Sequence, residues 1–196
     1  MEAKVRVRVR WQGRLCVRGR CAGFTLVEVL CVAALVGVSA VGALAGFDAA
    51  ARAARVRVAA GTLAWDLRSA RAEAVMRGRR VTVCASADGV RCGGAWGQGW
   101  MVFDDGGGGG QPASGRDVLR ARTAWRGVEV HADLPVRAAV SYTAGGWPRQ
   151  AQGALQMGSF LLCAGPGMGR RVVLSASGRV RVESGFDPGV CAVSAG

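Results

Sequence analysis

The 196-residue chain has few of the side chains that enzymes use for catalysis. It has a single histidine, His131, and contains neither G-x-S-x-G nor H-E-x-x-H. One histidine cannot form a metal site by itself, and the two missing motifs are typical of serine hydrolases and zinc proteases. The sequence offers no catalytic residues in a recognisable arrangement. We therefore predict that the protein is not an enzyme and carries no cofactor.

Sites for metal ions or nucleotides are also weakly supported. Asp104 and Asp105 precede five glycines, but no Gly-Lys-Ser/Thr follows, so we interpret the run as a flexible loop rather than a phosphate cradle. Two adjacent acids can bind calcium, yet in a glycine loop they usually form a solvated turn. Gly165, Gly167 and Gly169 are spaced like part of a dinucleotide fingerprint, but no helix is expected after them. We predict a hairpin loop there and no metal site.

The N-terminal quarter of the chain separates basic from apolar residues. Residues 1–23 carry seven basic side chains and one acidic one, whereas residues 24–47 contain a single charge, Glu28. A membrane-spanning helix needs about 20 apolar residues, so the second segment is long enough to cross a bilayer. It is too long for the apolar region of a cleavable secretory signal, and no A-x-A-like site follows it. The preceding arginines predict a cytoplasmic N-terminus, with the rest of the chain across the membrane.

The junction of these two segments carries a specific motif. Gly23-Phe24-Thr25-Leu26-Val27-Glu28 follows the basic leader and opens the apolar run. This arrangement resembles the processing site of type IV prepilins and pseudopilins. The resemblance implies that prepilin peptidase cleaves after Gly23 and that the new N-terminal residue, Phe24, is methylated. It also implies a single-pass protein of the bacterial inner membrane whose periplasmic head joins a filament of other pilins.

Glu28 is the hallmark acid of that family, and its position has a physical explanation. An ionisable group in hydrocarbon costs at least a few kcal/mol by insertion scales, so it is normally matched to a partner. In a filament, Glu28 of one subunit can pair with the Phe24 ammonium of its neighbour. Loss of the pair would leave a buried charge uncompensated. We interpret Glu28 as an assembly determinant; the alternative is a glutamate near a helix end that reaches the headgroups.

Residues 48–78 are predicted to continue the helix. They are rich in alanine, arginine, leucine and glutamate and contain no proline. Apolar residues recur at intervals of three and four, at Val56, Ala60, Leu63, Leu67, Ala70 and Ala74. Asp66 and several arginines are expected away from this face. The pattern predicts one helix from Phe24 to about Arg77, with Gly78 as its C-cap.

From residue 79 onward, short alternating runs separated by glycines and polar turns predict β-strands. The predicted strands are 80–85, 99–104, 118–122, 128–131, 138–143, 159–163, 171–175 and 179–183. We interpret Trp96 and Trp100 as core or turn anchors rather than a ligand platform, and His131 as a surface residue. The predicted fold class is α+β. A long N-terminal helix, transmembrane over 24–47, packs against an antiparallel β-rich head of residues 79–196.

The head strengthens the resemblance. A cysteine-bearing strand at 81–84 leads to W-G-Q-G-W-M-V-F-D-D at 96–105, and a Gly-Arg-Val-Arg strand follows at 178–181. These segments resemble the head of the GspH/FimT class of minor pseudopilins. The resemblance implies a pilin fold and a structural subunit near the tip of a filament. That filament is either a type II secretion pseudopilus or a type IV pilus.

Four cysteines follow the apolar run, at Cys84, Cys92, Cys163 and Cys191, and none of them forms a C-x-x-C pair. An even number of cysteines in an oxidising compartment favours disulfides. We favour Cys84 with Cys92, closing a short turn, and Cys163 with Cys191, tying down the C-terminal tail. A four-cysteine zinc site is the alternative, and the missing C-x-x-C spacing disfavours it.

Positive charge is concentrated in the second half of the head. No acid occurs between Asp133 and Glu183, a stretch with six arginines: Arg137, Arg149, Arg170, Arg171, Arg179 and Arg181. Arg179 and Arg181 point to the same face of their strand because side chains alternate, while Val180 and Val182 are expected to face inward.

This arginine pair suggests an alternative function in DNA binding. The pair, with Arg170 and Arg171 one hairpin away and Arg149 in the same basic stretch, suits the phosphate spacing of double-stranded DNA. Binding would be independent of base sequence and sensitive to salt. The FimT members of the class are DNA receptors for natural transformation, and their Gly-Arg-x-Arg motif falls here on residues 178–181. The other interpretation is a solvated face or a contact with a neighbouring pilin.

Overall fold

The computed structural model describes residues 24–184 and residue 191, without the side chains of residues 38–45. The chain divides into two compact units, residues 1–44 and 45–196. The helix α1 spans Leu26–Arg77. The strands are β1 (Val81–Ala85), β2 (Gly99–Asp104), β3 (Val118–Thr123), β4 (Glu129–Ala132), β5 (Ala139–Tyr142), β6 (Gly158–Cys163), β7 (Gly169–Leu174) and β8 (Val180–Glu183). Short 3₁₀ helices occur at Trp96–Gln98, Gly115–Asp117 and Leu134–Val136.

The C-terminal end of α1 is fixed by the predicted glycine. Gly78 has a φ of 61°, in the left-handed region that glycine adopts without strain. The N–H of Arg79 donates to the carbonyl of Ala74, and the N–H of Gly78 donates to that of Val75. These two bonds form a Schellman motif, which satisfies carbonyls that the end of the helix would otherwise leave unpaired. The chain then turns directly into β1.

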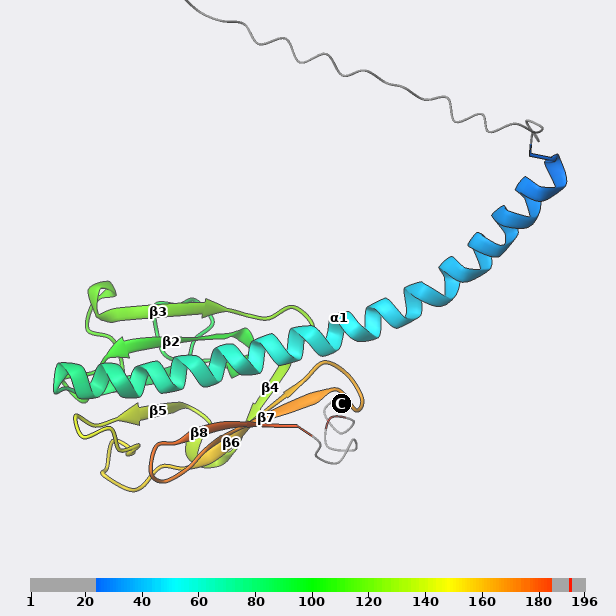
Figure 1. Cartoon of the computed structure of the whole chain (residues 1–196). Coiled ribbons are helices and arrows are strands. Elements are labelled where there is room, and N and C mark those ends of the chain that lie inside the picture. Colours follow the sequence, from blue (N-terminus) through cyan, green and yellow to red (C-terminus); the bar gives the residue numbers. More distant parts are fainter. Residues whose placement is uncertain (1–23, 185–190, 192–196) are drawn as a thin grey trace, which may run out of the picture. The chain divides into compact units, whose positions relative to one another are not determined.

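The strands form two antiparallel sheets of four, in the orders β3-β2-β1-β5 and β4-β6-β7-β8. Figure 1 shows strands of both sheets beside the C-terminal part of α1. The described strands confirm the predicted ones, with ends that differ by at most two residues. Short hairpins join β6 to β7 and β7 to β8, and the segment 164–168, with its glycines, forms the first of these turns.

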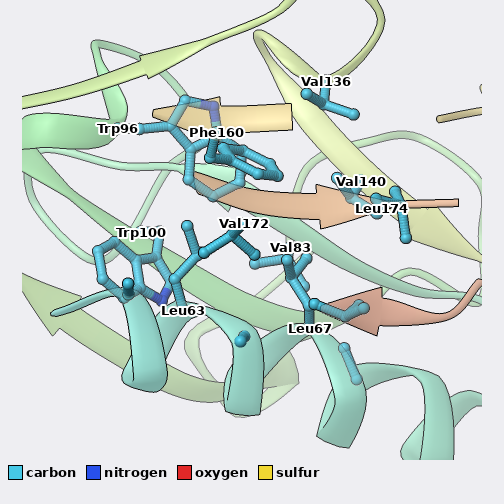
Figure 2. Close-up of a cluster of buried hydrophobic side chains, with 14 of the residues drawn as sticks. Leu63, Leu67, Val83, Trp96, Trp100, Val136, Val140, Phe160, Val172 and Leu174 are labelled. Carbon is cyan, nitrogen blue, oxygen red and sulfur yellow. The ribbon is translucent and has the colours of Figure 1, made fainter. Parts of the chain in front are cut away.

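One core joins α1 to both sheets (Figure 2). The predicted apolar face of α1, called here the helix stripe, is buried along its whole length, and Leu63 and Leu67 are fully inaccessible. The helix stripe consists of Val56, Ala60, Leu63, Leu67, Ala70 and Ala74. The stripe packs with Val83 of β1 from one sheet and Val172 of β7 from the other. Trp96 and Trp100 are 2% and 1% exposed, which confirms their interpretation as core residues. This shared core positions the outer surfaces of the head relative to one another.

The outer face of the first sheet carries a smaller core. Cys84, Met101 and Phe103 are buried there, with Cys92 and Val118 against them. Cys84 and Cys92 form a disulfide, so the loop after β1 is tied across this face. The Gln111 side chain bonds both backbone groups of Cys92: its Oε1 accepts the Cys92 N–H at 2.9 Å and its Nε2 donates to the Cys92 carbonyl at 3.1 Å. Loops therefore cover a face that would otherwise expose aromatic and sulfur-containing side chains.

The second favoured disulfide is also present, between Cys163 of β6 and Cys191. The four cysteines of the head thus form two disulfides and do not gather as a zinc site. Cys191 is 5% exposed, and it ties the C-terminal region to the second sheet. The residues on either side of Cys191 lie outside the described part of the chain.

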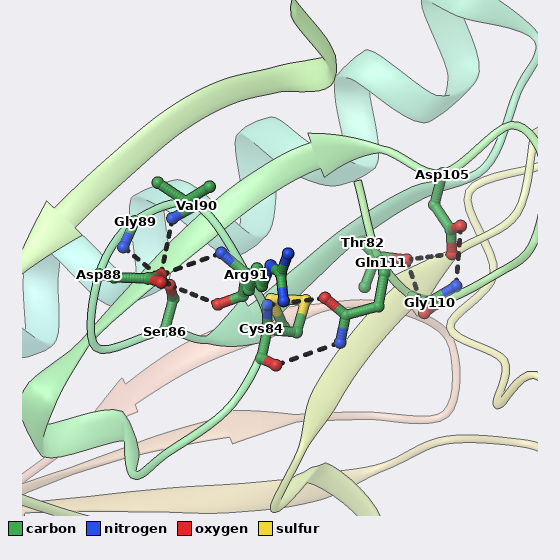
Figure 3. The surroundings of a disulfide bond; sticks show 12 residues. Thr82, Cys84, Ser86, Asp88, Gly89, Val90, Arg91, Asp105, Gly110 and Gln111 are labelled. Carbon is green, nitrogen blue, oxygen red and sulfur yellow. Dashed lines mark hydrogen bonds between the residues drawn. A yellow bond between two sulfur atoms is a disulfide. The ribbon is translucent and has the colours of Figure 1, made fainter. Parts of the chain in front are cut away.

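Three expectations about polar and apolar positions need correction. Asp66 is fully buried and not on the solvent side of α1, and Asp105 is 4% exposed rather than solvated. Asp105 accepts hydrogen bonds from the Thr82 hydroxyl and the Gly110 N–H, which anchors the glycine run at its base (Figure 3). Val182 is 40% exposed because it lies near the end of β8, an edge strand, whereas Val180 is buried.

The predicted transmembrane segment, residues 24–47, lies at the start of α1. Among the described residues, no helix combines the length and the apolar character needed to cross a bilayer.

Truncation of the helix stripe is expected to destabilise the head. Leu63→Ala should lower the free energy of unfolding by about 2–5 kcal/mol, because it removes contacts with both sheets and leaves a cavity. Met76→Ala is the control, since Met76 is 73% exposed on the same helix and should change stability by at most about 0.5 kcal/mol. Denaturant unfolding followed by tryptophan fluorescence measures both. Equal effects would show that α1 does not organise the core.

Candidate functional site

The start of α1 places the predicted processing and assembly residues within one helical turn. The N–H of Glu28 donates to Thr25 Oγ1 at 3.3 Å, and the N–H of Val29 donates to the Thr25 carbonyl at 3.2 Å. Thr25 therefore caps the helix, with Glu28 at the third helical position. An acid in the first turn is stabilised by the helix dipole. Phe24 is 79% exposed directly before this cap, and Gly23 lies outside the described residues.

The first turns of α1 expose apolar side chains on every side of the helix. More than half of the surface is accessible at Phe24, Leu26, Val27, Val29, Leu30, Val32, Leu35 and Val36. A helix that is apolar all round is normally covered by lipid or by other protein, since soluble monomers rarely expose such continuous patches. The described start of this unit therefore carries a continuous apolar surface of the kind that lipid or other protein normally covers.

A buried carboxylate fastens α1 to the first sheet. Asp66 accepts a hydrogen bond from Trp100 Nε1 at 2.9 Å. The Arg122 guanidinium donates to both Asp66 oxygens, from Nε at 3.1 Å and from Nη2 at 3.3 Å. These bonds to Asp66 raise the pKa of Arg122, while its partial burial acts in the opposite direction. A helix, β2 and β3 thus meet at one carboxylate.

Arg120 extends this network along the helix. Its guanidinium lies 4.6 Å from the Trp65 ring centroid, in cation–π geometry, and 3.8 Å from a Glu73 oxygen. Glu73 in turn pairs with Arg77 at 2.8 Å. This network was not among the predictions from the sequence, although the sequence contains a signal for it: Asp66 lies three residues after Leu63 and four before Ala70, on the apolar stripe itself. An acid at such a position has to find a partner when the helix packs.

The C-terminal hairpin gathers three of the predicted DNA-binding arginines on one face. Arg171 of β7 lies opposite Glu183 of β8, Val173 lies opposite Arg181, and the Ser175 N–H donates to the Arg179 carbonyl. These residues share the outward face, because the alternate positions Val172 and Leu174 are buried. Arg179 and Arg181 are both exposed. They also line a surface pocket of about 430 Å³ with Ser175, Ser177 and Val180.

The positive charge of this face is smaller than the sequence predicts, because an acid lies beside it and two of the predicted arginines lie elsewhere. Arg181 Nε lies 2.6 Å from Glu183 Oε1, so part of its charge is already compensated. Arg170 alternates with Arg171 and therefore points to the opposite face of β7, where Nη1 donates to the Gly169 carbonyl. Arg149 lies on a separate loop and donates to the Gly153 carbonyl at 3.1 Å. Arg171, Arg179 and Arg181 share a face; Arg170 and Arg149 are not part of it.

The single histidine is exposed on β4, as interpreted. Its Nε2 lies 3.5 Å from a Glu129 oxygen, on the same face of the strand. Over the described residues, no three His, Cys, Asp or Glu side chains come close enough to hold a metal ion.

Two protein-family models match the chain, one at the start of α1 and one over the rest of the helix and most of the head. A model of the prokaryotic N-terminal methylation motif matches residues 18–44, which include the capped start of α1. A model of the type II transport protein GspH matches residues 59–178, from the helix stripe to the last hairpin. The chain belongs to the GspH family. Members of this family are minor pseudopilins, a structural class, and the N-terminal motif agrees with processing by prepilin peptidase.

The GspH fold agrees with a solved minor pilin. A crystal structure of the type IV minor pilin FimU from Pseudomonas aeruginosa matches with a TM-score of 0.50 and 24% identity, over 66% of this chain and 88% of FimU. A second crystal form of FimU matches with a TM-score of 0.49 and 22% identity, over 65% and 92%. The first match confirms the pilin fold, a long helix on antiparallel sheets. No curated protein sequence matches the chain.

Removal of the arginine that compensates the buried carboxylate should be costly. Arg122→Ala leaves Asp66 buried without its bidentate partner, so we expect a loss of about 3 kcal/mol in the free energy of unfolding. Arg126→Ala, at an exposed arginine just after β3, is the matched control and should cost at most about 0.5 kcal/mol. The double variant Asp66→Ala/Arg122→Ala should be less destabilised than the sum of the two single variants. Additive losses would contradict direct coupling.

Proposed function

We propose that this GspH-family member is cleaved after Gly23, methylated at Phe24, and assembled through α1 into the tip of a periplasmic filament. The domain boundaries follow from this proposal: a leader at 1–23, a membrane-inserted segment at 24–47, a helical continuation at 48–78 and a head at 79–196. The observation that carries it is the capped helix start, whose apolar residues are exposed on all sides directly after the processing motif. Before assembly the bilayer covers this surface; afterwards neighbouring helices do.

A periplasmic head is supported by its cysteines. Both disulfides lie in the unit of residues 45–196, where an oxidising compartment would preserve them. The arginine-rich leader supports a cytoplasmic N-terminus in the inner membrane. The filament is a type II secretion pseudopilus or a type IV pilus, and the other pilins or pseudopilins of that filament are the partners.

The charge pair between subunits gives this proposal its mechanism. Cleavage creates an ammonium group on Phe24, one turn before the Glu28 carboxylate. Within one chain, the helix geometry keeps Glu28 in the first turn of α1, bonded through its N–H to Thr25. Its carboxylate is then available to the ammonium of a neighbouring subunit in the apolar interior, where compensation matters most.

Substitution at this site should separate processing from assembly. Gly23→Arg should leave the leader attached, because a long charged side chain would occupy the position next to the cut. Glu28→Ala should be processed normally, but its amount in filaments should fall by about tenfold or more, since the Phe24 ammonium would be left uncompensated. Intact-mass spectrometry measures cleavage and methylation at the N-terminus, and the amount of the chain in sheared filament fractions measures assembly. Glu28→Asp is the control that keeps the charge. Normal assembly of Glu28→Ala would overturn the mechanism.

We propose DNA binding as a second candidate function, favoured by the shared outward face of Arg171, Arg179 and Arg181. Two exposed arginines two residues apart, Arg181 in the edge strand β8 and Arg179 just before it, can contact successive phosphates. The pair of Arg181 with Glu183 argues for weak binding, because the acid competes with phosphate for the same guanidinium.

A salt-controlled titration tests this candidate. The chain should bind double-stranded DNA at low salt and lose affinity as salt rises, and Arg179→Ala/Arg181→Ala should reduce affinity by about tenfold and make the salt dependence less steep. Arg116→Ala/Arg126→Ala removes the same charge from exposed positions elsewhere and should have little effect. Fluorescence anisotropy with labelled duplex measures each variant. Equal losses in both double variants would indicate a general charge effect and reject this face as the site.

A further inference from the structure

The segment 147–157 forms a small hairpin beside β5 that none of the functions above uses. The Arg149 N–H donates to the Ser141 carbonyl at 2.9 Å, which joins the hairpin to the edge of the first sheet. Its two arms are joined by bonds from the Gln156 N–H to the Pro148 carbonyl and from the Gln150 N–H to the Ala154 carbonyl. We call this segment the 147–157 hairpin.

The inner face of the hairpin is locked by one buried amide. Gln156 is 4% exposed, and its Nε2 donates to the carbonyls of Pro135 and Ala139 at 2.8 and 2.6 Å. Its Oε1 accepts the Ser141 N–H at 3.1 Å. A buried side chain whose donors and acceptor are all used fixes the position of the strand that carries it.

The outer face of the hairpin is apolar and exposed. Arg149 lies opposite Leu155, and continuation of that register places Trp147 opposite Met157. These alternate positions point away from the buried Gln156 and Pro148. Trp147 is 51% exposed, Leu155 51% and Met157 55%. Three large apolar side chains on a fixed backbone therefore face solvent beside one arginine.

The turn that carries Trp147 is held against α1. Gly146 has a φ of 75°, and a side chain there would come within 3.0 Å of Val75 Cγ2. The Trp147 N–H and carbonyl both bond to Thr143. The tryptophan backbone is therefore preorganised, so little conformational entropy would be lost if the side chain entered a partner's pocket.

We propose that Trp147, Leu155 and Met157, with Arg149 at their edge, form the interface for the head of a different filament subunit. That partner presents an apolar surface with at least one carboxylate. The composition fits, because Trp, Met and Arg are enriched where protein interfaces are most buried. The inference rests on the proposed function, since it presumes assembly with other pilins, and it adds which surface makes the contact.

Charge disfavours a symmetric contact with a second copy of this chain. Two copies meeting through the same surface would bring Arg149 against Arg149, and the sequence has no acid between Asp133 and Glu183 to compensate them. Acids elsewhere in the described head are mostly engaged already within the chain: Asp66, Glu73, Asp88, Asp104, Asp105, Asp117, Asp133 and Glu183. Asp48 and Glu129 are the described acids of this unit outside that set, and neither belongs to the hairpin. A symmetric contact through the hairpin therefore supplies Arg149 with no carboxylate, which favours a different subunit as its source.

The aliphatic side chains of the hairpin also favour a protein, rather than a nucleic acid, as its partner. Bases stack on aromatic rings and guanidinium groups, whereas Leu155 and Met157 offer no such plane. Arg149 is the only arginine on this face of the hairpin, and Nη1 is already bonded to the Gly153 carbonyl. One arginine beside three apolar residues matches a desolvated protein contact better than a phosphate backbone.

Co-purification of the full-length chain tests the proposal. The tagged chain is co-expressed with each other prepilin-like subunit of its source, one at a time, and extracted in mild detergent. Wild type should retain one of these subunits. Trp147→Ala/Met157→Ala and Arg149→Glu should each reduce the retained amount by about tenfold or more, as expected for interface hot spots. Val90→Ser is the control, because Val90 is 59% exposed in the loop after β1 and should retain the subunit fully.

The outcomes separate this inference from the proposed function. If wild type retains no subunit and its leader stays uncleaved, both fail. If wild type is cleaved and retains a subunit, but the hairpin variants retain it equally, only the interface is wrong. Hairpin-dependent retention of an untagged second copy, or of DNA that nuclease removes, would overturn the proposed partner. Formation of both disulfides in every variant, measured by thiol labelling, verifies that the variants are folded.

Discussion

Burial of one stripe of α1 is the interaction on which the head depends. Leu63 and Leu67 are inaccessible because strands from both four-stranded sheets pack on the same few helical turns. A sheet with one apolar face must cover it, and this helix covers two of them. The outward surfaces, including the C-terminal hairpin and the 147–157 hairpin, take their positions from that packing.

The same helix leaves its other apolar surface uncovered. Between Phe24 and Val36 the apolar side chains are exposed on all sides of the helix. In the proposed function, lipid or neighbouring subunits cover them. The proposed function therefore gives α1 two purposes, folding of the head and assembly of the filament. We propose that Glu28 contributes to assembly, because a charge in an apolar environment is stabilised by a partner of opposite charge.

Charge in the head is arranged by the fold more than by the composition. The arginine-rich stretch after Asp133 looks uniform in sequence, yet Arg171, Arg179 and Arg181 share one face while Arg170 points to the other. Arg120 and Arg122 are used internally, on Asp66, Trp65 and Glu73. A high net charge is therefore a poor guide to a binding surface, because several of these cations stabilise the helix against the sheet.

The sequence by itself determined the helix, the eight strands, the helix stripe, the cap at Gly78 and the preferred disulfide pairs. These depend on local periodicity, on glycine's conformational freedom and on loop closure, all of which can be read along the chain. Only the tertiary structure decided that Asp66 is buried against Trp100 and Arg122, that Asp105 is buried against Thr82, and that the 147–157 hairpin lies at the edge of the first sheet. Each of these depends on contacts between residues distant in sequence or on the position of a strand at a sheet edge, and periodicity records neither.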